Sequence, residues 1–299
     1  MDRLEGMSIL VAVVDAGSLS AAARQLGQPL ATVSRKVGDL EAHLKTRLLH
    51  RTTRHLSLTE AGESYVASCR RILEDIGEIE RAVTGEYAAP KGSLVVTAPV
   101  VFGRLHVVPV MAAFLAHFPE IDARLVLTDR NVNFLEDHVD VAVRIGQLPD
   151  SSLVAIRLGE TRPVVCASPA YLAEHGTPDS PAALASHACI GFEGINSSRA
   201  WTFSGEKSEQ SVPIHARLVT NTAESAIDAA TFGTGLTRVL SYQVASAVQE
   251  GRLQLVLETF GLAPMPIHLV HAGQTPLPLK LRAFLDFMSP RLKARMSGV

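Results

Sequence analysis

Residues Leu30–Leu44 read LATVSRKVGDLEAHL, and their spacing predicts an amphipathic helix. The apolar residues recur at steps of three and four along one helix face: Leu30, Val33, Val37, Leu40 and Leu44. The other face holds small and hydroxyl residues beside two cations: Ala31, Thr32, Ser34, Arg35 and Lys36. We expect the apolar stripe to pack on neighbouring helices and the polar face to stay outward.

Two shorter helices precede this segment. The first has an apolar stripe that ends before Gly17, formed by Leu4, Met7, Val11 and Val14. Ser18 is placed to cap a second helix, Leu19 to Leu26, which Gly27 ends. Two short helices joined by a tight turn are typical of a helix-turn-helix, in which residues 30–44 would be the helix that enters the major groove. The alternative is an ordinary helix whose polar face is only solvated.

The segment after this helix favours nucleic-acid binding. RTTRHLSL, residues 51–58, is rich in β-branched and alternating apolar residues and predicts a hairpin, or wing. Thr59 would cap the next helix. The whole chain has a formal net charge of −2, but residues 24–55 carry seven cations against two anions, a net +5. Such a basic block beside a helix-turn-helix predicts phosphate contacts.

SLSAAARQLGQPLATVSRKVGDLEAHL and RLLHRTTRHLSLTEAG together resemble the DNA-binding module of LysR-type transcriptional regulators. The constellation A-A-x-x-L, V-S-R, L-E-x-x-L, L-L-x-R and L-T-x-A-G carries the resemblance, and Lys45 departs from it where the family commonly has glycine. The resemblance implies base contacts from five residues: Gln28, Leu30, Ala31, Thr32 and Arg35. It implies phosphate contacts from four others: Ser34, Lys36, Arg51 and Arg54. Double-stranded DNA with an inverted-repeat operator is the expected partner.

A heptad stripe follows, formed by Tyr65, Cys69, Ile72, Ile76, Ile79 and Val83. We predict a long helix that pairs two protomers, so that two recognition helices meet two half-sites. The alternative is a lone amphipathic helix packed on its own domain. The family's linker helix has this place and role. The predicted division is therefore residues 1–59 for the winged helix-turn-helix, 60–90 for the dimerisation helix and hinge, and 91–299 for an effector-binding domain.

The C-terminal part alternates short apolar strands with helices, which predicts an α/β fold of parallel sheets with helices on both faces. Its length suits two lobes, lobe I at 91–161 plus 267–299 and lobe II at 162–266. The layout resembles the family's effector domain, which shares the periplasmic-binding-protein architecture. Ligands of such folds lie between lobes at strand ends and helix N-termini, which nominates Thr97, Ala98, Pro99, Val100, Thr128, Phe192, Asn221 and Thr222. The alternative is that the threonines only cap helices or end strands.

Other classes of protein lack support in the sequence. We find no G-x-S-x-G, Walker A, H-E-x-x-H or G-x-G-x-x-G motif, so we expect no enzyme, cofactor or metal. Cys69, Cys166 and Cys189 form no metal-binding or disulfide pattern. This cysteine pattern fits a reducing cytoplasm. No apolar run reaches the length of a membrane span. The leading hypothesis is a sequence-specific transcriptional regulator modulated by a small-molecule effector bound between the lobes.

The sequence leaves two alternative functions open. One is a solute-binding protein or small-molecule enzyme with an unrelated helical N-terminus. The other is an architectural DNA-binding protein whose effector half is vestigial. The residues favour a dimer, and a tetramer rests on the resemblance alone. They do not identify the effector, the operator and target genes, or activation versus repression.

Overall fold

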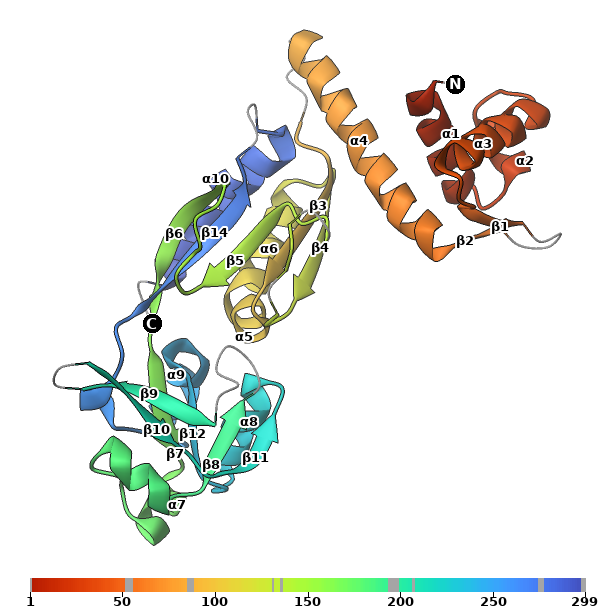
Figure 1. Ribbon diagram of the computed structural model, residues 1–299. Coiled ribbons are helices and arrows are strands. Elements are labelled where there is room, and N and C mark those ends of the chain that lie inside the picture. Colours follow the sequence, from red (N-terminus) through yellow and green to blue (C-terminus); the bar gives the residue numbers. More distant parts are fainter. Residues whose placement is uncertain are drawn as a thin grey trace. The chain divides into compact units, whose positions relative to one another are not determined.

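The computed structural model describes residues 2–51, 56–84, 89–130, 132–134, 137–192, 199–205, 208–273 and 277–296, with backbone alone at 51, 75, 78, 79 and 81–84. The chain forms two compact units, Met1–Ser93 and Leu94–Val299 (Figure 1). After the roles that the resemblance implies for them, we call them the DNA-binding unit and the effector unit, and we treat each by itself.

The DNA-binding unit contains four helices and a two-stranded hairpin in its described residues: α1 Arg3–Asp15, α2 Leu19–Gln25, α3 Leu30–Leu44, β1 Leu49–Arg51, β2 Leu56–Leu58 and α4 Glu60–Thr84. The predicted cap of α2 is confirmed, because Ser18 Oγ accepts a hydrogen bond from the Ala21 N–H at 3.1 Å. Gly17 and Gly27 both have positive φ and end α1 and α2. The helix-turn-helix predicted from the turn chemistry is therefore present.

The core of this unit forms where α3 crosses α1 and α2. Val33, Val37 and Leu40 are buried there against α1 residues such as Leu10 and Val13. One expectation was wrong, because Leu30, the first residue of the apolar stripe, has 49% of its surface exposed. It lies at the N-terminal end of α3, before the helix reaches its neighbours. The stripe that packs therefore begins at Val33.

The predicted wing is confirmed where it is described. β1 pairs antiparallel with β2, and Leu49 lies opposite Leu58. Thr59 then caps α4, accepting from the Gly62 N–H at 3.0 Å while its hydroxyl donates to the Arg47 carbonyl at 2.8 Å. The wing tip at 52–55, which includes Arg54, lies outside the described residues.

Helix α4 is only partly free of its own unit. Cys69 is fully buried and Tyr65 packs on the same core, beside Val66. Arg70 forms an ion pair with Asp15, which ties α4 to the end of α1. The first part of the heptad stripe thus follows the alternative reading, packing on its own domain. Ile72 is the first residue of the stripe that is exposed, with 37% of its surface open to solvent.

The described residues of the effector unit form two five-stranded sheets. The first has the order β4-β3-β5-β14-β6, with strands β3 Gly92–Ala98, β4 Ile121–Leu127, β5 Val141–Ile145, β6 Leu153–Thr161 and β14 Met265–Ala272. The second has the order β11-β8-β12-β7-β13, with strands β7 Pro163–Ala167, β8 Cys189–Phe192, β11 Ala216–Thr220, β12 Leu236–Leu240 and β13 Gln254–Val256. We call the parts around these sheets lobe I and lobe II.

The expectation of purely parallel sheets was wrong. β3 and β5 are parallel, but β14 runs antiparallel to both β5 and β6. In lobe II, β8 and β12 are parallel, whereas β7 is antiparallel to β12 and β13. The antiparallel pairs involve β6, β7, β13 and β14, the strands next to the two points where the chain passes between the lobes.

Helices cover the sheets, as Figure 1 shows. In lobe I, the continuous segment α5 Val100–Phe102, η1 Gly103–Val107 and α6 Val108–His117 packs beside α10 Leu279–Met296. In lobe II, α8 Ala223–Thr231 and α9 Ser241–Gln249 pack on one face. A hairpin of β9 Ala200–Ser204 and β10 Glu209–Pro213, together with α7 Pro169–His175, packs on the other. Alternate β7 residues separate the two cores: Val164 faces the helices, Val165 the hairpin.

The sequence predicted no stretch long enough for a membrane span, but among the described residues one continuous helical stretch, Val100–His117, passes that test by length and composition. In this fold 44% of it is buried inside the effector unit. The pair α1 and α2 also passes the same test together, with a bend of 113° between them. Core helices of folded domains pass such a test as well, so these stretches are accounted for by the cores that they build.

Candidate DNA-binding face and effector cleft

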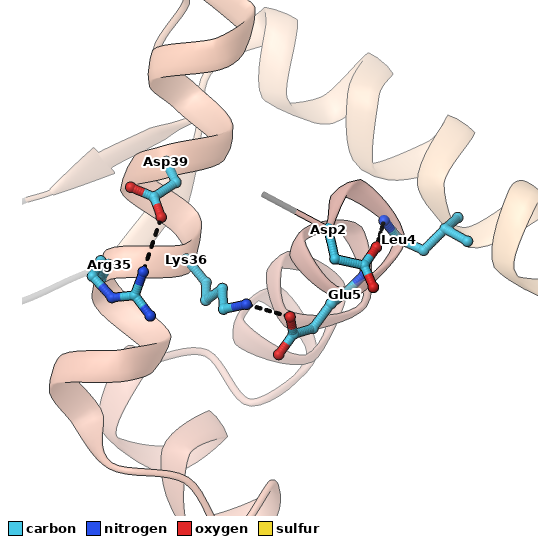
Figure 2. Close-up of polar contacts among 6 residues, drawn as sticks. All are labelled: Asp2, Leu4, Glu5, Arg35, Lys36 and Asp39. Carbon is cyan, nitrogen blue, oxygen red and sulfur yellow. Dashed lines mark hydrogen bonds and ion pairs between the residues drawn. The ribbon is translucent and has the colours of Figure 1, made fainter.

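The exposed face of α3 carries the side chains predicted to read bases. Ala31 is exposed, Thr32 is half-buried, and the Arg35 side chain has 63% of its surface exposed. Arg35 Nη1 lies 3.3 Å from Asp39 Oδ2, one helical turn away (Figure 2). An exposed pair of this kind contributes only about 0.2–1 kcal/mol. The guanidinium is therefore held in place weakly and is available to exchange Asp39 for a guanine edge or a phosphate.

Lys36 lies elsewhere than predicted. Its ammonium forms an ion pair with Glu5 of α1, and its side chain has only 18% of its surface exposed (Figure 2). The expectation that Lys36 lies on the outward face of α3 was wrong, because the helix turns this position toward α1. The contact joins two elements across 31 residues of sequence. Lys36 thus helps to position α3, and its charge is already paired within the unit.

The other predicted DNA contacts lie just before α3, in its first two turns and on the wing. Leu30 is exposed, and Gln28 and Ser34 are half-buried. The Gln28 side-chain oxygen is buried with no hydrogen-bond partner in the described part of the chain. The Arg51 side chain and Arg54 lie outside the described residues.

Sequence reasoning assigned no role to Arg47, although it counted the residue in the basic block. Arg47 is exposed between α3 and β1, beside the C-terminal end of α3. That end is made by Lys45, whose φ of +53° gives the left-handed turn that usually takes glycine. The departure from the family pattern at Lys45 therefore leaves the end of α3 where a glycine would put it.

A cleft of about 450 Å³, open to solvent, lies in the effector unit where lobe I meets lobe II. Residues from both lobes line it: Pro99, Asp129, Ile145, Phe192, Arg238, Val239, Leu240, Tyr242, Gln243 and Met265. Apolar walls with a few polar groups are typical of small-molecule sites. Two predicted effector residues, Pro99 and Phe192, are among those lining the cleft.

The remaining predicted effector residues do not line this cleft. Thr97 and Ala98 are buried in β3. Thr128 Oγ1 accepts from the Arg130 N–H at 3.2 Å, so it closes a local turn. Thr222 caps α8 by accepting from the Ser225 N–H at 3.3 Å, and Asn221 beside it is exposed. The capping alternative describes Thr128 and Thr222 as this structure places them.

Asp129 fills the helix N-terminus that the sequence suggested for a ligand. Its Oδ1 accepts a hydrogen bond from the Val100 N–H at 3.2 Å, next to Pro99. Burial raises the pKa of the Asp129 carboxyl above its usual value; Val100 opposes this shift, and nearby Glu224 adds to it. The positive end of the helix is thus already paired with a carboxylate. An incoming anion would meet Asp129 there rather than free amides.

The floor beside the cleft is an aromatic cluster that joins the lobes. The Tyr242 ring of α9 lies edge-on to Phe102 at 5.5 Å and near His106 at 5.7 Å. Both ring nitrogens of His106 are buried without a hydrogen-bond partner among the described residues. Burial, aided by Arg295, lowers the pKa of His106 to about 4, so the ring is neutral at pH 7. The aromatic cluster is therefore uncharged at pH 7. Elsewhere between the lobes, Arg104 Nε of η1 lies 3.6 Å from Glu224 Oε1 of α8.

Comparisons with known proteins agree with both units. Residues 4–63 match the family described as bacterial regulatory helix-turn-helix protein, lysR family, and residues 88–293 match the LysR substrate binding domain. A transcriptional regulator of Xanthomonas campestris is 36% identical over 95% of this chain and 84% of its own length. A transcriptional repressor of Pseudomonas aeruginosa is 35% identical, over 96% and 92%. The activator AaeR of Escherichia coli is 30% identical, over 97% and 94%.

Solved structures agree as well. CrgA, a LysR-type regulator from Neisseria meningitidis, has a TM-score of 0.62 and 34% identity, covering 96% of this chain and 98% of that one. Full-length LysG from Corynebacterium glutamicum with bound effector Arg shares the fold at a TM-score of 0.57 and 21% identity, with 98% of each chain covered. The chain belongs to the LysR family: it is a DNA-binding transcriptional regulator with an effector-binding domain. Proteins of this family regulate transcription and are not enzymes.

Proposed function

We propose that this regulator binds an inverted-repeat operator as a dimer in the cytoplasm, and that a small molecule in the cleft between its lobes controls it. The observation that carries the proposal is the exposed face of α3 with Arg35 on it, beside a wing and the exposed Arg47, joined in one chain to a two-lobed unit with a cleft. A ligand that prefers one lobe angle shifts the population of protomer arrangements, and with it the spacing of the recognition helices.

On the DNA side, Thr32 and Arg35 are the proposed base-reading residues, with Ala31 giving close approach to the groove and Gln28 and Leu30 at its edge. Ser34, Arg51 and Arg54 are the proposed phosphate contacts, and Arg47 joins them because it is exposed beside the wing. Lys36 is left out because Glu5 already pairs its ammonium.

Dimerisation is proposed through the part of α4 beyond the domain core. Tyr65 and Cys69 are used within the DNA-binding unit, so the pairing stripe starts at Ile72 and continues through Ile76, Ile79 and Val83. Its heptad spacing suits a two-helix seam. A tetramer built through the effector units is a further step of the same proposal, and sedimentation of the purified protein measures it.

On the effector side, the proposed contacts are Pro99 and Phe192, joined by Asp129, Tyr242 and Met265. The relatives include a repressor and an activator. Whether this chain represses or activates is decided by transcription from its own operator with the gene intact and deleted.

The test compares two arginines by fluorescence anisotropy, on the DNA beside the coding region and on a scrambled duplex, across a salt series. Arg35→Ala should cost about 1–3 kcal/mol on the operator and little on scrambled DNA, because it removes a base contact. Arg47→Ala should weaken both duplexes alike and lower the salt slope by about one. Equal losses on both duplexes for both variants would refute this division. Affinity independent of salt would refute the DNA-binding face itself.

A further inference from the structure

Lobe II contains a second cavity that the effector cleft does not explain. Its volume of about 370 Å³ includes space that is open to solvent, and it lies between the sheet and β9, beside both segments where the chain passes between the lobes. Apolar and aromatic side chains form most of its wall, among them Val256, Leu257, Phe203, Phe260 and Leu262. Its polar side chains are Arg162, Thr202, Arg238 and Glu258.

Arg238 is the unusual member of this wall. It lies in the strand LTRVL, whose other residues are apolar or threonine, and only 8% of its surface is exposed. Arg238 pairs in register with Val165, whose side chain belongs to the core under the hairpin. Its guanidinium lies 5.6 Å from the Phe203 ring centre on that same side. The strand therefore directs this cation into the layer that contains the cavity.

This guanidinium has no hydrogen bond or ion pair within the part of the chain that the structure describes. Burial lowers the pKa of Arg238, yet an arginine stays protonated at pH 7 in any protein environment. Glu209 on β10 acts on it only at longer range. A buried cation without a counter-ion is costly, and a planar guanidinium matches a carboxylate through two parallel hydrogen bonds.

One ion pair lies at the mouth of the cavity, and it carries no net charge. Arg162 Nη2 lies 3.4 Å from Glu258 Oε2, and both side chains are about half exposed. The local charge from these three residues is thus one positive charge in excess, located on Arg238. An anion fits this excess, and the aromatic and aliphatic wall fits an apolar body attached to it.

We propose that this cavity is a second small-molecule site, which binds a monocarboxylate with an aromatic or aliphatic body. The carboxylate pairs with Arg238, and the body packs on Phe203 and Phe260. Arg238 also lines the effector cleft, so the two sites share one side chain. If the proposed function holds, occupancy here changes the affinity of the cleft for its effector, since the coupling between two sites is reciprocal. Binding itself does not depend on the proposed function.

The probes are phenylacetate and hexanoate, with phenylacetamide as a neutral control, in thermal unfolding and calorimetric titration of the full chain. Both carboxylates should raise the melting temperature with saturation, since a ligand of the native state stabilises it; the amide should not. Arg238→Met should weaken binding at least about tenfold, the value of a charge-assisted pair. Leu262→Trp should abolish binding by filling the cavity. Met265→Trp fills the effector cleft instead and should leave binding in the cavity unchanged.

Three outcomes would overturn the site. One is protection that survives both Arg238→Met and Leu262→Trp. Another is protection lost in Met265→Trp but kept in Leu262→Trp, which places the ligand in the cleft. The third is no protection by either carboxylate up to about 20 mM. Leu262 is half-buried at the rim, so its variant tests the site even if Arg238→Met unfolds. Loss of operator binding alone would refute the proposed function and leave this site standing.

Discussion

The DNA-binding face and the effector cleft are built in opposite ways. The face on α3 comes from one run of residues, 28–35, whose outward positions follow from the period of a single helix. The cleft combines Pro99, Asp129, Phe192, Arg238 and Met265, which are spread over more than half of the chain. A local site survives as long as its helix does, whereas a dispersed site depends on two sheets and two crossings. The following predictions test that contrast.

The largest effect is expected at Gly62 in the DNA-binding unit, where no space exists for a side chain. A Cβ on Gly62 would lie 2.0 Å from the Leu48 carbonyl oxygen. This is a backbone atom, so a change of side-chain rotamer cannot relieve the clash. Gly62→Ala should destabilise the DNA-binding unit by about 3 kcal/mol or more, measured by urea unfolding and by loss of operator binding. Gly38→Ala on α3 is the matched control, because nothing lies within 4 Å of its Cβ. It should be neutral or stabilise by about 0.5–1 kcal/mol. Similar losses in both would show that the clash is not the cause.

A second effect should be a pH dependence of stability that arises in the effector unit. The folded pKa of His106, about 4, lies below the unfolded value of about 6.5, so the unfolded state binds the extra proton between them. Stability of the effector unit should be complete above pH 6.5 and fall by up to about 3 kcal/mol as the pH drops toward 4. His106→Leu should remove this part of the slope.

The comparison is between wild type and variant in urea titrations from pH 7.5 to 4.5. His117→Leu, at an exposed position on α6, is the control and should keep the wild-type slope. An unchanged slope in His106→Leu would mean that His106 is not the group responsible.

The smallest effect concerns the end of α3. Lys45 holds a left-handed conformation with φ of +53°, which costs a residue with a Cβ about 1 kcal/mol relative to glycine. Lys45→Gly should stabilise the DNA-binding unit by about that amount in thermal unfolding. Gly17→Ala, at φ of +69° with nothing within 4 Å, should lose a similar amount. A destabilised Lys45→Gly would show that the lysine side chain contributes more than its backbone strain removes.

Periodicity and capping predicted much of the secondary structure. Ser18 and Thr59 cap the helices expected of them. The hairpin β9–β10 was not predicted: β9 alternates, with Trp201 and Phe203 buried, but β10 has only one buried residue, Val212, to mark it as a strand. β6 was missed as well, since only two of its nine residues, Leu158 and Thr161, are buried. The direction of β7 and β14 depends on how the chain crosses between lobes, which no local pattern encodes.

The site shows the same division between local and long-range information. Arg35 could be placed from the helix period alone, whereas Lys36 could not, because its partner Glu5 is on another helix. Arg238 carried a signal, a single cation inside an apolar strand, but its meaning depends on the cavity around it. Asp129 gave no signal at all, since its contact with Val100 spans 29 residues.

By itself the sequence determined the winged helix-turn-helix, the outward face of its third helix and the two-lobed plan, because helix period, turn residues and charge act over a few neighbouring positions. The tertiary structure alone decided the mixed sheets, the lining of the cleft and the isolation of Arg238. Those features arise from contacts between distant segments, where packing and desolvation, rather than local preference, set the free energy.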